Sequence, residues 1–89
     1  MNSVTTEAFR RLYAAASASK QAQIKRAYKL WRDSPAHPSL RFKKVYATEP
    51  IYSARVDLDW RALGVMDGDT VVWFWVGAHD EYTQLLKRM

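Results

Sequence analysis

The chain has 89 residues, of which 48% are hydrophobic and 13% aromatic, a composition that excludes a disordered polypeptide. It has no cysteine, which excludes disulfides and thiolate metal sites. The net charge is +5, and residues 1–44 carry ten lysines and arginines against two acidic residues. This asymmetry favours a polyanionic partner, either nucleic acid or an acidic protein, over a surface that is basic only for solubility.

The sequence shows no targeting segment. The first residues, Met-Asn-Ser-Val-Thr-Thr-Glu, have neither the basic nor the apolar region of a secretory signal. The longest apolar run, residues 71–76, has the length of a strand and is far too short to span a membrane. We therefore expect one domain over residues 1–89, in the cytoplasm and without membrane contact.

Two amphipathic helices are predicted first. Thr5 or Thr6 can cap the first helix, and Ser19 can cap the second after a short connection over residues 17–19. Proline ends the second helix at residues 33–35. Apolar side chains recur with helical spacing in both, at Phe9, Leu12, Tyr13 and Ala16, and then at Ile24, Ala27, Tyr28 and Trp31.

After Pro38 the apolar period changes to two, which predicts strands at residues 40–47, 52–58, 60–65 and 71–76. Asp67-Gly68 predicts a hairpin turn, and the apolar run after it should be central and buried on both faces. Residues 80–89 should add a helical turn or a tail. The predicted fold is α+β, an N-terminal helical hairpin on a curved, mostly antiparallel four-stranded sheet. The helices should cover the face of Tyr52, Ala54, Val56 and Leu58, leaving Arg55 on the uncovered face.

Three segments carry a family resemblance: residues 35–44, the stretch Tyr52-Ser-Ala-Arg-Val-Asp-Leu-Asp-Trp-Arg61, and the stretch Trp75-Val-Gly-Ala-His-Asp-Glu-Tyr82. With the order of the elements, they make the chain resemble the RelE/ParE superfamily of toxins from type II toxin-antitoxin systems. Two features depart from that pattern. Ser53 stands where related nucleases often carry a second basic residue, and residues 1–5 are barely long enough for the strand with which the family usually opens.

The resemblance implies a metal-independent endoribonuclease that cleaves mRNA, in association with the ribosome, and arrests translation. Cleavage requires proton transfer at the 2′-hydroxyl and the 5′-oxygen, and stabilisation of the phosphate. Arg55 and Arg61 suit the phosphate, His79 suits proton transfer near neutral pH, and Tyr82 can orient a phosphate or stack on a base. The candidate nucleic-acid-binding residues are Lys43, Lys44, Arg41, Lys25 and Lys29.

Other interpretations of these residues stand beside this one. Arg61 can instead pair with Asp57 or Asp59, His79 can be a structural histidine, and His37 is expected to be structural or exposed. At the level of function, the alternatives are a ParE-like toxin that inhibits gyrase without nuclease activity, and a non-toxic binding module. The expected partners are a cognate antitoxin protein, mRNA and the ribosome. No cofactor is expected, and no metal site, because His37 and His79 lie far apart and no carboxylate cluster has ligand spacing.

Overall fold

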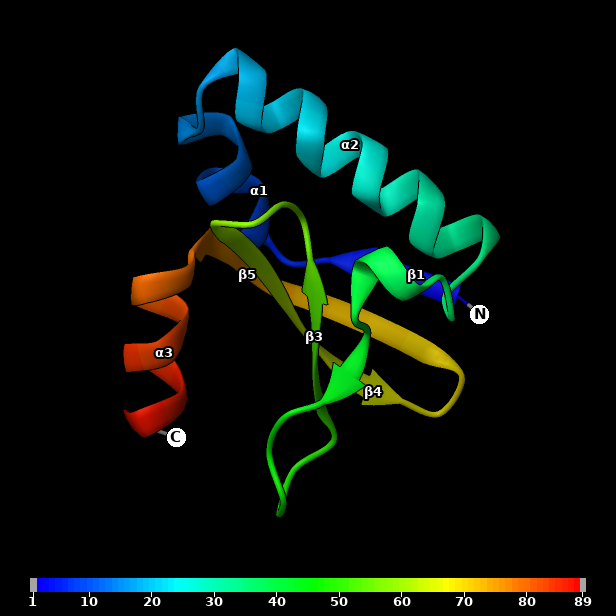
Figure 1. Ribbon diagram of the computed structural model, residues 1–89. Helices are drawn as coiled ribbons and strands as arrows, with labels where there is room; N and C mark the ends of the chain where they lie inside the picture. Colours follow the sequence, from blue (N-terminus) through cyan, green and yellow to red (C-terminus); the bar gives the residue numbers. More distant parts are fainter. Residues whose placement is uncertain (1, 89) are drawn as a thin grey trace.

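The computed structural model describes residues 2–88, which form a five-stranded sheet with helices on both faces (Figure 1). The strand order is β1-β5-β4-β3-β2, antiparallel except for the parallel pair of β1 and β5. In chain order the elements are β1 (Asn2–Thr5), α1 (Glu7–Ala15), α2 (Ala18–Asp33), a 3₁₀ turn η1 (Pro38–Leu40), β2 (Lys43–Lys44), β3 (Ile51–Arg55), β4 (Trp60–Asp67), β5 (Thr70–Ala78) and α3 (His79–Arg88). The α+β class and the helical hairpin are as predicted.

The prediction of four strands was wrong, because residues 2–5 form a fifth at the sheet edge. This strand is too short to show an alternating pattern by itself. It forms because β5 offers a free edge, where the backbone N–H of Asn2 donates to Asp69 O and that of Thr6 to Trp73 O, at 3.0 and 2.9 Å. The N-terminal strand that the family resemblance implies is therefore present.

The helix caps are those predicted from the sequence, except that the cap of the second helix lies two residues earlier. The Thr6 hydroxyl accepts from Phe9 N at 3.1 Å, which confirms it as the cap of α1. Ser17, and not Ser19, caps α2, since its hydroxyl accepts from Lys20 N at 3.1 Å. The second helix ends at Asp33, as the following proline predicts.

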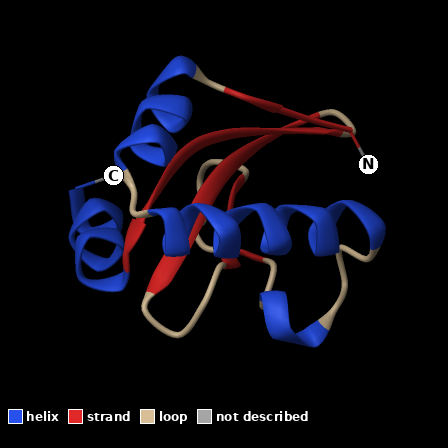
Figure 2. Cartoon of the chain, turned by 90° about the horizontal axis from the view of Figure 1, so that it is seen from above, coloured by secondary structure: helices blue, strands red, loops and turns tan. Residues whose placement is uncertain are grey.

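The core lies between the helical hairpin and one face of the sheet, with α2 lying across the strands (Figure 2). Trp31 of α2 and Trp73 of β5 meet edge to face at 5.3 Å between ring centroids, and both are almost fully buried. Ala54 lies in this core and Val56 packs against it, as predicted for this face. The prediction fails at Leu58, which is 74% exposed because the strand ends at Arg55 and the chain turns.

The predicted strand over residues 40–47 is mostly irregular. Pro38 starts a 3₁₀ turn in which Leu40 is buried, and Arg41 takes a left-handed conformation with φ of +45°. Within residues 40–47, Lys43 and Lys44 pair with β3, and the backbone N–H of Val45 also donates to Ile51 O at 2.9 Å. The alternation of Leu40 and Phe42 with basic residues is therefore not that of a strand, because the left-handed residue between them interrupts the extended backbone.

The second face of the sheet is also covered, by α3, where the prediction left it open. Ser53 is 3% exposed and Leu63 is fully buried on this face. Helix α3 replaces the predicted turn or tail, and Met89 lies outside the described residues. The interior position of β5 is as predicted, but Val72 and Phe74 are only half-buried, so burial on both faces is incomplete. None of the helices in residues 2–88 has the length and apolarity needed to cross a bilayer.

Candidate phosphate-handling site

Two arginines stand directly opposite each other on neighbouring strands. The antiparallel register pairs Arg55 of β3 with Arg61 of β4, and Ser53 with Leu63 two residues further along. Because side chains of opposed residues share a face, all four lie on the face that α3 covers, away from the helical hairpin. Like charges opposed in this way destabilise a sheet, so the pair does not serve the stability of the sheet.

The guanidinium of Arg61 is fixed by the turn between β3 and β4. One terminal nitrogen donates to the carbonyl oxygens of Asp57, Leu58 and Trp60, at 2.8, 3.4 and 3.0 Å. Burial lowers the pKa of Arg61 from its usual value and the Arg55 charge lowers it further, although the group stays charged at neutral pH. The predicted alternative, a pair with an acidic side chain, is thus replaced by bonds to backbone carbonyls.

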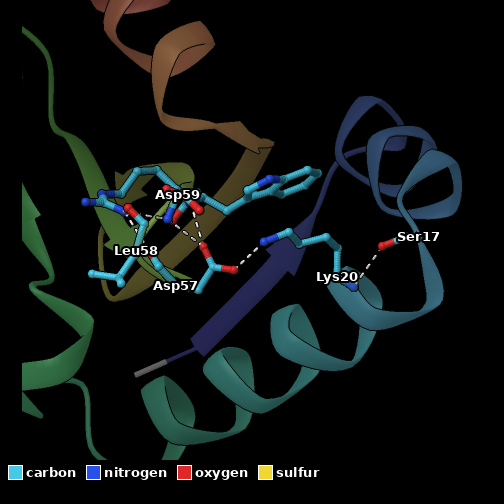
Figure 3. Close-up of polar contacts among 7 residues, drawn as sticks. Ser17, Lys20, Asp57, Leu58 and Asp59 are labelled. Carbon is cyan, nitrogen blue, oxygen red and sulfur yellow. Dashed lines mark hydrogen bonds and ion pairs between the residues drawn. The ribbon is translucent and has the colours of Figure 1, made fainter.

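A brace between the turn and α2 holds these carbonyls in position (Figure 3). One carboxylate oxygen of Asp57 accepts from the backbone N–H groups of Asp59 and Trp60, both at 2.8 Å. The other oxygen accepts from the ammonium of Lys20, which points toward it from the first turn of α2. The same ammonium lies 5.5 Å from the centre of the Trp60 ring, a cation–π distance. We call the set Lys20, Asp57 and Trp60 the brace.

The imidazole and the phenol come from the start of α3. The backbone N–H of His79 donates to Asp59 O at 2.6 Å, which joins the beginning of α3 to the same turn. The side chain of His79 is exposed, and its ring lies 5.6 Å from that of Tyr82 between centroids. The Tyr82 hydroxyl reaches the Ser53 hydroxyl at 3.5 Å, and Tyr82 lies close enough to Arg61 to act on the pKa of Arg61 in the direction opposite to burial.

The structure brings together some of the predicted basic residues and separates others. Lys43 pairs with Ser53 and so shares its face, whereas Lys44 pairs with Tyr52 on the opposite face. Arg41 is close enough to Arg61 to lower its pKa. Lys25 and Lys29 are exposed on α2, in the helical layer on the far side of the sheet from the arginine pair. Of the two lysines on β2, only Lys43 can replace the charge missing at Ser53.

Sequence reasoning missed the brace, although part of its signal was present. Asp57 followed by Asp59 and Trp60 has the spacing of a side chain that caps its own turn. Lys20 lies 37 residues away along the chain, so no local pattern indicates it. His37 is exposed, as predicted, and its ring nitrogen accepts from Ser39 N at 3.2 Å.

Together, these contacts set two guanidinium groups, a phenol and an imidazole on strand ends and a helix start that meet at one turn. The guanidinium groups can bind phosphate oxygens, and the exposed imidazole is a candidate for proton transfer. Gly77 stands opposite Arg61, where an added Cβ would lie 2.6 Å from the Trp75 ring, so this position excludes a side chain. Within residues 2–88, no three His, Asp or Glu side chains gather as a metal-ligand set.

A family comparison matches residues 18–84 to a ParE-like toxin domain. The chain belongs to this family. The match includes the arginine pair, the brace and the start of α3, so the candidate site lies wholly within the matched segment. The match begins at residue 18, after β1 and α1, which belong to the fold seen here but not to the matched segment.

Solved structures of toxins have the same fold as this ParE-like domain. YafQ from E. coli strain BL21(DE3) aligns with a TM-score of 0.73 at 12% identity, covering 91% of this chain and 96% of that one. The RelB–RelE antitoxin–toxin complex from Methanococcus jannaschii gives 0.72 at 16% identity, covering 92% and 96%. The YoeB/ParE toxin from Agrobacterium tumefaciens gives 0.69 at 14% identity, covering 89% and 99%. A search of curated proteins finds no match.

Proposed function

We propose that this ParE-like domain is the toxin of a type II toxin-antitoxin system and acts as a metal-independent endoribonuclease on mRNA at the ribosome, in the cytoplasm. The observation that supports this most is the register of β3 and β4, which opposes two arginines beside an exposed histidine. Within residues 2–88, neither arginine has an acidic partner at salt-bridge distance that would neutralise it. An unpaired cationic pair on one face suits a phosphodiester.

In the proposed reaction, the 2′-hydroxyl loses its proton and its oxygen attacks the adjacent phosphorus. The bond from phosphorus to the 5′-oxygen breaks, and that oxygen takes up a proton, leaving a 2′,3′-cyclic phosphate and a 5′-hydroxyl. Arg55 and Arg61 stabilise the negative charge on the crowded phosphate. His79 performs one of the two proton transfers, and Tyr82 orients the phosphate or stacks on a base. Lys43 and Arg41 hold the flanking strand by its phosphates.

The decisive experiment replaces His79 by alanine. Induction of the wild-type chain in bacteria should stop translation rapidly and produce new 5′ ends in mRNA. His79→Ala should lose both effects, while its melting temperature stays within about 2 °C of wild type, because the side chain is exposed and surface changes alter stability little. His37→Ala makes the same substitution at an exposed histidine outside the candidate site, so it serves as the matched control and should retain activity.

Other results would redirect the assignment. DNA damage and filamentation with intact translation would support the alternative of gyrase inhibition, and full toxicity of His79→Ala would remove the imidazole from the mechanism. A wild-type chain that can be induced without any effect on growth would favour a non-toxic binding module. Following translation, replication and transcript ends separately after induction distinguishes the three.

We propose that the cognate antitoxin docks in the groove between α1 and α2. This groove has a volume of about 430 Å³ and is lined by the aromatic side chains of Phe9, Tyr13 and Tyr28, with Arg10 and Lys25 beside them. An apolar floor with basic neighbours fits an amphipathic helix that carries acidic residues. Two of the structurally similar toxins, the RelE of Methanococcus jannaschii and YafQ of E. coli, were themselves solved in complexes with antitoxins.

Charge reversal tests this docking site. Lys25→Glu should weaken antitoxin binding about tenfold or more, because it sets a like charge against an acidic helix at the groove. Lys44→Glu, on the far sheet edge, is the matched control and should bind as the wild type does. Isothermal titration of purified toxin with the antitoxin gives both affinities. Equal affinities for the two variants would contradict the groove as the docking site and leave the nuclease proposal unaffected.

A further inference from the structure

A strained backbone lies close to the arginine pair. Within residues 2–88, Arg41 is the one non-glycine residue with a positive φ, and it has φ of +45° and ψ of +42°. This left-handed conformation brings the Cβ of an L-residue too close to the backbone, so the position after a helical turn commonly holds glycine or asparagine. Strained residues persist where the surrounding structure fixes them, and they cluster at functional sites.

The residues on either side fix this conformation. Leu40 is 2% exposed in the core, and the ring of Phe42 stacks on that of Tyr52 at 5.1 Å between centroids. Phe42 also meets Trp31 edge to face at 5.8 Å. Arg41 itself is exposed. The two apolar neighbours therefore hold the backbone in the left-handed turn, while the side chain of Arg41 stays at the surface.

The turn brings Arg41 to the arginine pair. The antiparallel register of β2 and β3 pairs Lys43 with Ser53. Continuing this register by two residues sets Arg41 at the level of Arg55, which is itself opposite Arg61. The η1 turn contacts β3, and besides burial and the charge of Arg55, the charge of Arg41 lowers the pKa of Arg61. Three guanidinium groups thus lie near one another on neighbouring segments.

The charge of Arg41 is available to a ligand. Within residues 2–88, no carboxylate lies at ion-pair distance from it. Neighbouring strands lie about 4.8 Å apart, so a row of three guanidinium groups across them spans about 10 Å. The forks of two arginines already satisfy the oxygens of one phosphate. A third guanidinium at the end of the row therefore suits a second phosphate of the same strand.

We infer that Arg41 holds the phosphate next to the one that Arg55 and Arg61 hold, so that the site grips two consecutive phosphates of a single strand. The inference rests on the proposed RNA substrate. The left-handed turn sets the distance from the guanidinium of Arg41 to the arginine pair, and the strain is retained for substrate binding. A ligand with one phosphate gains nothing from Arg41.

Arg41→Gly tests the strain, because glycine adopts the left-handed conformation readily. The melting temperature should rise by about 2–5 °C, since relief of strain and of repulsion with the arginine pair exceeds the greater freedom of glycine in the unfolded chain. Arg41→Asn, which also tolerates this conformation, should be at least as stable as wild type. Arg32→Gly is the matched control in the last turn of α2, where glycine is unfavourable, and its melting temperature should fall.

Binding is measured with two DNA probes that the proposed reaction cannot cleave, because they lack the 2′-hydroxyl. The thymidine dinucleotide TpT has one phosphate and the trinucleotide TpTpT has two, and each is titrated into the ¹⁵N-labelled full chain. Arg41→Gly should bind TpTpT about fivefold more weakly than wild type and TpT equally well. For TpTpT, the slope of log affinity against log salt should decrease by about 0.7, the value for one phosphate contact. Arg41→Lys should recover much of the affinity, and Arg32→Gly should bind both probes as wild type does.

The outcomes separate this inference from the proposed function. Lower melting temperatures of both Arg41→Gly and Arg41→Asn would make Arg41 a structural residue and overturn the inference. So would an affinity for TpTpT that falls no more than that for TpT, or mRNA cleavage by Arg41→Gly at the wild-type rate, and these results leave the nuclease proposal unaffected. A wild-type chain that binds TpTpT through Arg41 but cleaves no mRNA would support the grip on two phosphates and contradict the nuclease.

Discussion

Arg61 and His79 belong to the same candidate site, but the fold treats them differently. Arg61 is held by three backbone carbonyls in a turn that the brace ties to α2. His79 has an exposed ring, which lies beside the ring of Tyr82. The contrast teaches that one half of the candidate site is preorganised by the fold, whereas the other half is exposed to solvent. Stability and activity should therefore separate between the two halves.

Asp57→Ala should have the largest effect on the braced half. It removes the acceptor for two backbone N–H groups and leaves Lys20, whose side chain is 26% exposed, without its partner. We expect a loss of about 2–3 kcal/mol in the free energy of unfolding, measured by urea denaturation. Asp59→Ala, an exposed neighbour, should change it by less than about 0.5 kcal/mol. Equal losses of unfolding free energy in Asp57→Ala and Asp59→Ala would contradict the conclusion that the fold preorganises the Arg61 half of the site.

Lys20→Met should have an intermediate effect. It removes the ion pair and the cation–π contact but leaves Asp57 bonded to the backbone of its own turn. We expect a loss of about 1 kcal/mol in unfolding free energy, since a partly exposed ion pair contributes modestly. Lys20→Arg keeps the charge and should recover much of the lost unfolding free energy. If the brace positions Arg61, the rate of mRNA cleavage falls in Lys20→Met at saturating substrate and recovers in Lys20→Arg.

The smallest of these effects should be the decrease in the free energy of unfolding at acidic pH. Burial raises the pKa of Asp57, but the Lys20 hydrogen bond and the N–H groups of Asp59 and Trp60 outweigh it, so the pKa lies below the usual value of 3.8. The unfolded state then binds the proton more readily. The stabilisation is fully present above the usual pKa and is lost as pH falls through the lower, folded value.

Urea denaturation between about pH 2 and pH 6 measures this effect, because carboxylates titrate in this range. Asp57→Asn cannot titrate, so the difference in unfolding free energy between wild type and this variant should shrink as the pH falls below about 4. A constant difference between wild type and Asp57→Asn would show that the carboxylate charge contributes nothing to the brace.

Much of the fold follows from local patterns. The helical spacing of Ile24 and Trp31 predicts the buried side of α2, and Asp67-Gly68 predicts the hairpin in which Gly68 takes φ of +62°. Local sequence patterns fail where the structure of a segment depends on a partner that is distant in sequence. Residues 2–5 become a strand only against β5, and Ser53 is buried only because α3 returns over it. The four candidate site residues were named from the sequence, and their chemical roles stay predictions.

The sequence by itself determined which residue types are available: an excess of cations in the first half, two arginines around a turn, and one histidine after the last strand. It also determined the helices α1 and α2 and the strands β3, β4 and β5 in their order, because hydrophobic periodicity is a local property. Only the tertiary structure decided that Arg55 faces Arg61, that Lys43 rather than Lys44 joins them, and that Lys20 braces the turn. Strand register and contacts between distant residues depend on the packing of the whole chain, which no short window of sequence contains.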